Sequence, residues 1–195
     1  MPEITHYAYD LEFLEDGRTI ELISIGIVSE TGRGYYAVNS DMPWDRIIAH
    51  DWLVRNVLPS LPLINQGSLD QYLAQSPNMH PRPSLAALDL DRHDTPVKPR
   101  WVIANEVRDF LLAEGEPELW ADWGAYDHVA LCQLWGPMIA LPQGIPMFTH
   151  DIEQELEHAP GLEKPKQGDG MHNALEDARH NMRVLKALGV VVADA

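Results

Sequence analysis

The chain has 195 residues, of which 45% are hydrophobic and 23% are charged, and this composition predicts one globular domain with a substantial core. Its formal net charge of −16 argues against a protein that coats nucleic acid through basic side chains, because such binding depends on Lys and Arg. The single cysteine, Cys132, excludes an internal disulfide framework and a zinc site built from several thiolates.

We expect neither a membrane span nor a secretion signal. No run of about 18 or more apolar residues occurs, so no transmembrane helix is predicted. Residues 1–6 lack the basic and apolar regions of a signal peptide. A cytoplasmic protein with no membrane partner is therefore expected, and Cys132 is predicted to be a small buried hydrophobe on the apolar face of a helix.

The N-terminal part of the chain predicts an antiparallel meander of three strands. Strand-forming residues run from 4 to 14, from 20 to 28 and from 35 to 39, with Asp-Gly and Gly-rich turn signals between them. The section from 42 to 99 then holds many of the prolines, with short helices expected at 44–57 and 68–74. Its Trp and Leu content argues against disorder, so we predict an ordered proline-rich insertion.

The rest of the chain alternates between helix and strand. Helices are predicted at 101–114, 125–134 and 172–188, and strands at 118–123 and 147–150. A meander followed by alternating elements predicts an α/β fold, with a mixed five-stranded sheet flanked by helices.

Asp10 and Glu12 stand two residues apart on the first predicted strand, so their side chains point to the same face. Like charges at this spacing repel unless something positive lies between them, and a divalent metal ion is the obvious candidate. The alternative is a solvated pair at the edge of a sheet.

Three further polar residues stand in a suggestive setting. Asp127 follows a predicted strand and begins a helix, where the helix dipole favours a carboxylate, although a capping Asp would look the same. His172 and Asp177 are roughly 140° apart around an ideal helix, so they converge only if His172 lies in the preceding loop. An exposed histidine and a solvated first-turn acid are the alternatives.

In this order, Asp10 with Glu12, then Asp127, then His172 with Asp177 resemble the three motifs of the DnaQ-like, DEDDh-type 3′–5′ exonucleases. This superfamily includes proofreading subunits, RNase T and oligoribonuclease. The residues around the second and third motifs are most similar to the actinobacterial polyadenylate-specific exoribonucleases of the RNase AS type.

The resemblance covers about residues 7–186 and implies a ribonuclease H-like fold in one exonuclease domain over 1–195, with 42–99 as an insertion. It implies single-stranded RNA, bound at its 3′ end, as the partner. It also implies a homodimer, because the RNase T-like relatives are homodimers. The candidates for phosphate contacts supplied across such a dimer are Arg82, Arg92, Lys98 and Arg100.

The resemblance also implies the roles of individual residues. Two Mg²⁺ ions, which Mn²⁺ can replace, would be held by Asp10, Glu12, Asp127 and Asp177. His172 would act as the general base toward water, and 5′-mononucleotides would leave the 3′ end of RNA, with poly(A) preferred. A DNA exonuclease of the proofreading type and a catalytically silent nucleic-acid-binding protein of the same fold are the alternatives.

The expected nucleotide-binding residues are Glu12, Phe13, Trp123 and His172. The resemblance places the backbone at Glu12 and Phe13 against the terminal sugar, where Phe13 can wedge against the last base. Strand alternation turns Phe13 away from Glu12, which favours core packing instead. Trp123 stands where the superfamily usually has Asn or Asp; it can stack beside the nucleotide or lie in the core, and we expect the core.

Overall fold

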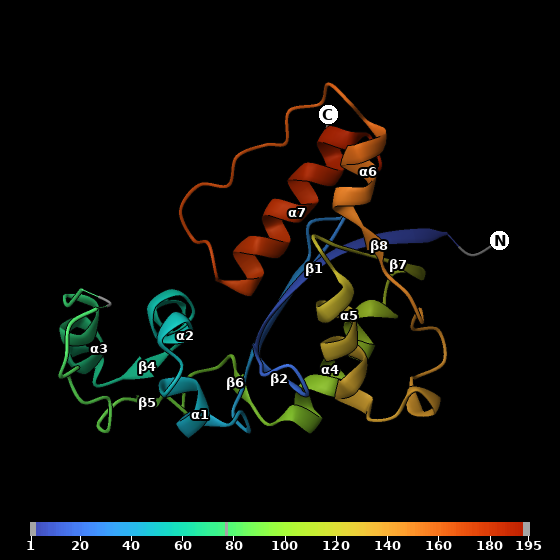
Figure 1. The fold of residues 1–195 in the computed structure, drawn as a ribbon. Coiled ribbons are helices and arrows are strands. Elements are labelled where there is room, and N and C mark those ends of the chain that lie inside the picture. The colour runs from blue at the N-terminus through green and yellow to red at the C-terminus, as the bar shows by residue number, and fades with distance from the viewer. Residues whose placement is uncertain (1–2, 77, 193–195) are drawn as a thin grey trace.

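A six-stranded sheet forms the centre of the fold, with helices on both of its faces (Figure 1). The structure, a computed structural model, describes residues 3–76 and 78–192. The strand order in this sheet is β6-β3-β2-β1-β7-β8. Its strands are β1 (Ile4–Glu15), β2 (Ile20–Ser29), β3 (Gly34–Asn39), β6 (Val97–Lys98), β7 (Glu116–Ala121) and β8 (His150–Asp151).

The first three strands form the predicted antiparallel meander, and β7 and β8 extend the sheet in parallel with β1. The predicted α/β class, a mixed sheet flanked by helices, is confirmed. The sheet has one strand more than the five predicted, because the two-residue β6 pairs with β3. That strand comes from the 42–99 section, where the sequence predicts none.

Helices account for most of the remaining regular structure. The predicted helix at 44–57 is two helices, separated at His50, which caps the second by accepting a hydrogen bond from the Leu53 amide. The helix predicted from His172 begins two residues later, at Ala174. The α-helices are α1 (Trp44–Ile48), α2 (Asp51–Asn56), α3 (Gln66–Leu73), α4 (Arg100–Leu111), α5 (Ala125–Cys132), α6 (Ile152–His158) and α7 (Ala174–Leu188), and the 3₁₀ helices are η1 (Leu58–Ser60), η2 (Gln133–Trp135) and η3 (Met138–Ala140).

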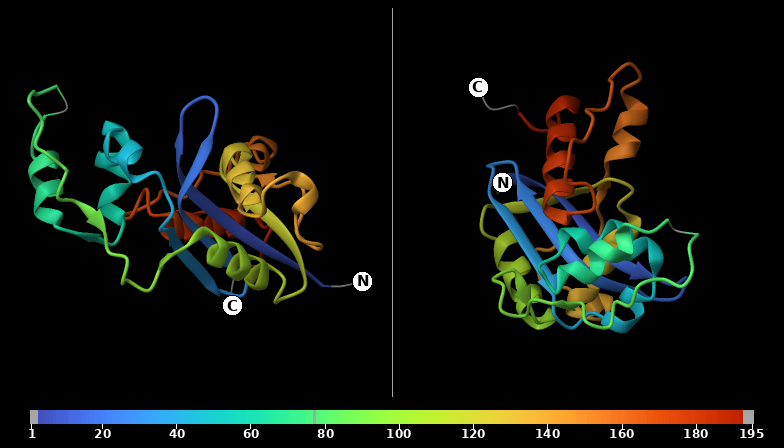
Figure 2. Two further views of the ribbon diagram at one scale, coloured as in Figure 1. Left: turned by 90° about the horizontal axis from the view of Figure 1, so that it is seen from below. Right: turned by 90° about the vertical axis from the view of Figure 1, so that its left-hand side faces the viewer.

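Helices α4 and α5 cover one face of the sheet, and α7 covers the other (Figure 2). Strand β1 serves both faces, because successive side chains of a strand point in opposite directions. Tyr7, Tyr9 and Leu11 are buried against α4 and α5. Ala8 is buried beneath α7, in a cluster with Met182 and other residues of that helix.

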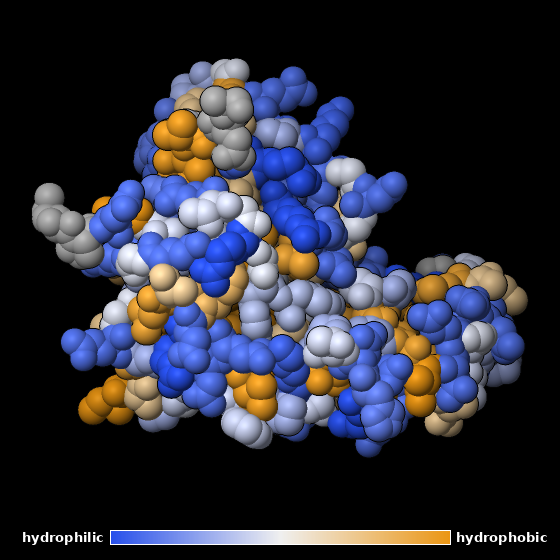
Figure 3. All heavy atoms as spheres, turned by 180° about the vertical axis from the view of Figure 1, so that it is seen from behind, coloured by the Kyte–Doolittle hydropathy of each residue, from blue (hydrophilic) through white to orange (hydrophobic). Residues whose placement is uncertain are grey.

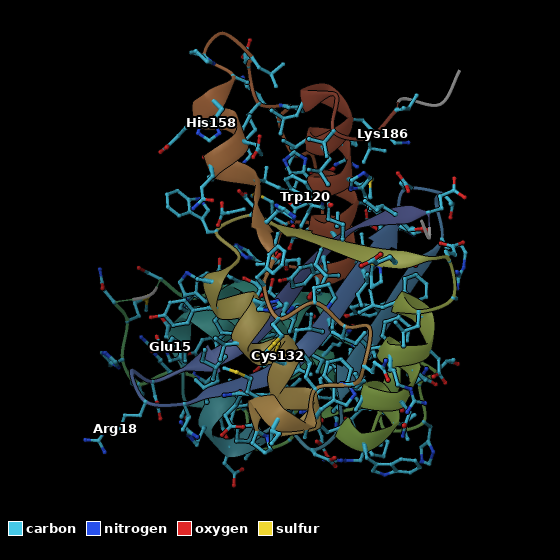
Figure 4. The ribbon with its side chains drawn as sticks, turned by 90° about the vertical axis from the view of Figure 1, so that its right-hand side faces the viewer. Glu15, Arg18, Trp120, Cys132, His158 and Lys186 are labelled. Atoms are coloured by element: carbon cyan, nitrogen blue, oxygen red, sulfur yellow. The ribbon has the colours of Figure 1, made fainter. Side chains whose placement is uncertain are left out.

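The two layers can be followed in Figure 4, where Trp120 lies toward α7 and Cys132 lies on α5. Cys132 is only half-buried, which corrects the prediction of a buried hydrophobe. Its Sγ atom lies 3.5 Å from Nε2 of His128, one turn earlier on the helix, beside a surface pocket that both residues line. The helix face that carries Cys132 is therefore turned partly away from the sheet.

The 42–99 section is ordered and has a hydrophobic cluster of its own. Strands β4 (Leu63–Ile64) and β5 (Asp89–Leu90) pair with each other in a small separate ribbon. The cluster includes Leu14 of β1, on the same side of the strand as Ala8. Between these two residues on that side stand Asp10 and Glu12. The apolar layers thus leave a gap over the two carboxylates, between α7 and the 42–99 section.

No helix within residues 3–76 and 78–192 is long and apolar enough to cross a membrane. The face of the molecule shown in Figure 3 is mainly hydrophilic, and its apolar residues form small patches rather than one continuous surface. Scattered apolar residues of this kind are normal on a folded protein.

Gly26 sets how closely α7 approaches the sheet. It pairs with Asp10 across β1 and β2, and a Cβ atom placed on it would lie 2.2 Å from the Ala174 carbonyl oxygen at the start of α7. Because this neighbour is backbone, the helix would have to move. We expect Gly26→Ala to lower the free energy of unfolding by about 3 kcal/mol.

Urea denaturation of the Gly26→Ala variant measures this effect. Gly67→Ala is the matched control, since nothing lies within 4 Å of a Cβ there and Gly67 is in helix α3. The control should be neutral or more stable by up to about 1 kcal/mol. Equal stability of the two variants would show that α7 does not depend on this close approach.

Candidate active site

A cleft opens over Asp10 and Glu12, on the α7 face of the sheet. It brings together all five residues that the three sequence motifs supply, from β1, α5, α7 and the loop before α7. The lining residues are Asp10, Leu11, Glu12, Phe13, Asp122, Asp127, Gln167, Met171, His172, Asp177, His180 and Asn181.

Asp10, Glu12 and Asp177 form the tightest acidic cluster, with one carboxylate oxygen of each within 4.8 Å of the others. Strand β1 aims the first two at the same point. Asp177 reaches that point from the first turn of α7. The helix starts at Ala174 because the side chain of Asn173 accepts hydrogen bonds from the first free amides, those of Leu175 and Glu176.

Asp127 lies in the first turn of α5 and is buried. One of its carboxylate oxygens accepts a hydrogen bond of 2.9 Å from the Leu11 amide, which ties α5 to β1 between Asp10 and Glu12. Asp127 lines the same cleft but stands outside the tight cluster. The predicted alternative of a helix cap does not apply, because this hydrogen bond joins it to another element.

Burial raises the pKa of the carboxylates of Asp10, Glu12 and Asp127 and so disfavours their charged forms. Burial, followed by repulsion from Asp177 and Asp127, raises the pKa of Glu12 to about 8. Burial and its acidic neighbours raise the pKa of Asp10 well above its usual range. Burial also raises the pKa of Asp127 to about 6, against the opposing effect of the Leu11 amide.

The donor set fits hard divalent cations such as Mg²⁺ and Mn²⁺, which prefer oxygen ligands. Three converging carboxylates need either protons or positive charge to remain close together. One oxygen of Asp122, also in the cleft, is buried and has no hydrogen-bond partner among the residues that the structure describes. The other oxygen of Asp122 accepts a hydrogen bond of 2.8 Å from Lys164.

The raised pKa of Glu12 predicts a pH-dependent stability in the absence of metal. In the folded chain Glu12 keeps its proton up to about pH 8, whereas in the unfolded chain it releases the proton near pH 4.5. The contribution of Glu12 to the free energy of unfolding is therefore complete below pH 4.5 and is lost as the pH rises through about 8. Between pH 6 and 8 we expect the free energy of unfolding to fall by about 2 kcal/mol.

Urea denaturation in EDTA at several pH values tests this expectation. Glu12→Gln is the matched variant, because it keeps the size of the side chain and removes the titrating group. Its unfolding free energy should depend less on pH over this range. A wild-type protein whose stability rises from pH 6 to 8 would contradict the expectation.

His172 lies in the loop before α7, as convergence with Asp177 requires. Its Nδ1 atom is 3.8 Å from a carboxylate oxygen of Glu12. Its backbone has φ of 63°, a left-handed conformation that costs a non-glycine residue about 1–2 kcal/mol. This backbone lets the chain turn into α7 while the imidazole stays in the cleft.

Phe13 lies between the core and the cleft. It packs against the core cluster of Tyr9 and Leu11, as strand alternation requires, yet it also lines the cleft beside Glu12. Its ring is stacked on Tyr126, with centroids 6.3 Å apart and planes at 15°. The strand is close to its end there, and its register with β2 shifts between Glu12 and Phe13.

The expectation for Trp123 is wrong. It is 74% exposed instead of buried in the core, and it is not among the residues that line the cleft. Its φ of 53° turns the chain sharply between β7 and α5, which removes it from the alternation of the strand. Only the expected core position is contradicted, and the nucleotide-binding role of Trp123 stays a prediction.

Several cleft residues were missed by the sequence motifs. Gln167 donates a hydrogen bond to Asp177 from the glycine-containing loop. Asn181 donates to the backbone carbonyl of Tyr9 at 3.3 Å, and His180 lies beside it. His180 and Asn181 follow Asp177 by three and four residues, so they lie on the same face of the predicted helix, and this spacing could have identified them as cleft residues. No comparable signal marks Gln167.

The four basic residues expected to contact phosphate all have partners within the chain. Arg82 pairs with Asp51 at 2.6 Å, and Lys98 pairs with Glu106 at 2.6 Å. Arg92 and Arg100 donate to backbone carbonyls, those of Ser40 and Gln133. A phosphate contact from any of them would require exchange of an existing interaction.

Comparison with curated proteins agrees with the 3′–5′ exoribonuclease activity that the motif resemblance implies. No protein-family model matches the chain. The nuclease domain of 3′hExo, a DEDDh family member solved with bound rAMP, aligns with a TM-score of 0.48 and 11% identity, over 95% of this chain and 90% of that one. Two curated 3′–5′ exoribonucleases, from two strains of Mycobacterium tuberculosis, are 41% identical over 179 residues, which is 91% of this chain and 89% of each relative. The chain belongs to the family of 3′–5′ exoribonucleases that these two relatives represent.

Proposed function

We propose that the chain is a metal-dependent 3′–5′ exoribonuclease that releases 5′-mononucleotides from the 3′ end of single-stranded RNA. The observation that carries this proposal is the convergence of Asp10, Glu12 and Asp177 on one point, with Asp127 and His172 in the same cleft. Membership in the exoribonuclease family supports the reaction and its direction.

The carboxylates of Asp10, Glu12, Asp127 and Asp177 would hold two divalent cations, with Mg²⁺ preferred and Mn²⁺ able to replace it. Bound ions of this kind supply the positive charge that phosphoryl transfer requires. The fixed positions of β1, α5 and α7 keep the four acidic side chains in place before substrate arrives. This preorganisation lowers the cost of gathering the charges during the reaction.

His172 acts as the general base and takes a proton from the attacking water. Histidine is the side chain most often used as a general base, and the place of His172 in the cleft, half-exposed beside Glu12, gives it access to solvent. Glu12 and Phe13 contact the terminal nucleotide, with the stacked rings of Phe13 and Tyr126 as an apolar wall for the last base.

Two finer assignments, a preference for poly(A) and a homodimeric assembly, rest on the family resemblance of the motifs. The cytoplasmic location rests on the sequence, which predicts neither a membrane span nor a signal peptide. We also assign the 42–99 section to the same domain as the rest of the chain, since its hydrophobic cluster includes residues of β1, β2 and β3.

A metal and substrate series tests the proposal. Metal-stripped protein is incubated with single-stranded RNA homopolymers, with and without Mg²⁺ or Mn²⁺, and mononucleotide release is followed. Release should need metal and should be fastest on poly(A). Equal rates in EDTA would refute the metal dependence. Faster release from a 3′-deoxynucleotide end than from a ribonucleotide end would favour a DNA exonuclease, and release from neither would indicate a silent binding protein.

A further inference from the structure

The side chain and the backbone of His172 are both held by the 42–99 section. The indole of Trp52, on α2, meets the imidazole edge-on, with centroids 5.1 Å apart and planes at 79°. The hydroxyl of Ser60, at the end of η1, lies 2.7 Å from the His172 carbonyl oxygen and 2.8 Å from the Val57 carbonyl oxygen, so its single hydrogen is shared between the two acceptors. Trp52 and Ser60 thus both contact His172, which lies more than a hundred residues later in the chain.

These contacts act on a residue that needs support. His172 has a positive φ, and such a conformation persists where the surroundings determine it. The Ser60 hydroxyl holds the carbonyl that this backbone turns toward the 42–99 section. Trp52 closes one side of the imidazole, whose Nδ1 atom faces Glu12 at 3.8 Å. Ring and backbone are therefore fixed from different directions.

The elements that carry Trp52 and Ser60 are themselves fixed to the catalytic strand. Leu53 and Leu58 are buried in the cluster that also contains Leu14, two residues after Glu12. The start of α2 is tied further by Asp51, whose carboxylate bonds to Arg55, Tyr72 and Arg82. Packing therefore determines where Trp52 and Ser60 stand relative to Glu12.

We propose that Trp52 and Ser60 are positioning residues for His172, and that the 42–99 section is the support that keeps this imidazole ready beside the acidic cluster. The proposal rests on the function proposed above. Both residues act through His172. A misplacement of a reacting group by about 1 Å can cost roughly 10²-fold in rate, so loss of either contact reduces turnover more than substrate binding.

The expected effects fall on kcat. Trp52→Ala should lower kcat by about 10- to 100-fold and change KM by less than about threefold. Ser60→Ala should lower kcat less, by about three- to tenfold, because the ring contact remains. Trp52→Phe keeps an aromatic edge against the imidazole and should recover most of the activity. Thermal denaturation of the Trp52→Ala variant shows whether its loss of activity reflects unfolding.

The decisive comparison uses the His172→Ala background. If Trp52 and Ser60 act only through the imidazole, adding either substitution to His172→Ala should cause no further loss of residual activity. The matched controls are Trp101→Ala, an exposed tryptophan on α4, and Ser84→Ala, an exposed serine of the same section. Both controls should keep wild-type kcat.

A spectroscopic readout separates positioning from general damage. In a protein with ¹³C-labelled histidine, Trp52→Ala should shift the His172 ring signals, because an indole edge at this distance affects their shielding. The signals of His158, exposed at the end of α6, should stay in place.

The outcomes distinguish this proposal from the function on which it rests. A wild-type protein without exonuclease activity would overturn both. An active wild-type protein whose Trp52→Ala and Ser60→Ala variants keep wild-type kcat would overturn only the positioning role. The positioning role would also be overturned if Trp52→Ala mainly raised KM. It would likewise be overturned if Trp52→Ala lowered activity as much in the His172→Ala background as in the wild type, since Trp52 would then contact RNA directly.

Discussion

Asp10→Asn is expected to lower kcat by about 10³-fold or more, which corresponds to about 4 kcal/mol of transition-state stabilisation. Asp10 belongs to the tight cluster with Glu12 and Asp177, so its charge is needed to hold the cations. The amide keeps the size of the side chain and one oxygen donor, but it removes the negative charge. The affinity for divalent cations should fall together with kcat.

Mononucleotide release and calorimetric titration with Mn²⁺ measure the two effects. Asp109→Asn is the control, because Asp109 lies on α4, is 69% exposed and pairs only with the neighbouring Arg108 among the described ion pairs. The control should match the wild type in both assays. An Asp10→Asn variant with wild-type activity would remove Asp10 from the metal site.

His172→Ala should give a different pattern, a fall in kcat of about 10²- to 10⁴-fold with divalent-cation affinity largely kept. The imidazole reaches the cleft beside Glu12 but stands outside the acidic cluster. Its removal therefore takes away the proton acceptor and leaves the oxygen ligands.

The control for this variant is His158→Ala, which removes an exposed imidazole at the end of α6 (Figure 4) that is not among the residues lining the cleft. It should keep full activity. If His172→Ala hydrolysed RNA at the wild-type rate, the assignment of the general base would be wrong. If it lost the metal as well, His172 would have to be counted among the residues that hold the site together.

Local patterns predicted most of the fold. The meander, the strand that carries Asp10 and Glu12, and α7 follow from hydrophobic periodicity and turn residues, which are short-range signals. The predicted positions of helix ends were less accurate. Asn173 starts α7 two residues later than predicted, because the side chain that caps it cannot be told from periodicity alone.

The motifs predicted which polar residues meet, and the structure places all five in one cleft. The sequence could not predict the exposure of Trp123, because the expectation rested on the usual burial of tryptophan, whereas a positive φ at this residue turns the chain after β7. It also could not predict that Gly26 admits the start of α7, because that contact joins residues far apart in the chain.

The role of the 42–99 section was hidden for the same reason. Trp52 and Ser60 stand in short helices whose local sequence explains their own packing. Their contacts with His172 depend on how the hydrophobic cluster around Leu14 places those helices beside the catalytic strand. Such long-range placement follows from the packed structure and leaves no local pattern.

The central claim is that the cleft around Asp10 removes nucleotides one at a time from the 3′ end of RNA. A time course with matched single-stranded RNAs, one labelled at the 3′ end and one at the 5′ end, tests it most directly. We predict that the 3′ label appears at once as a mononucleotide, whereas the 5′ label remains on chains that shorten gradually, and that EDTA stops both. Early release of the 5′ label as a mononucleotide, or internal fragments from either RNA, would contradict the account.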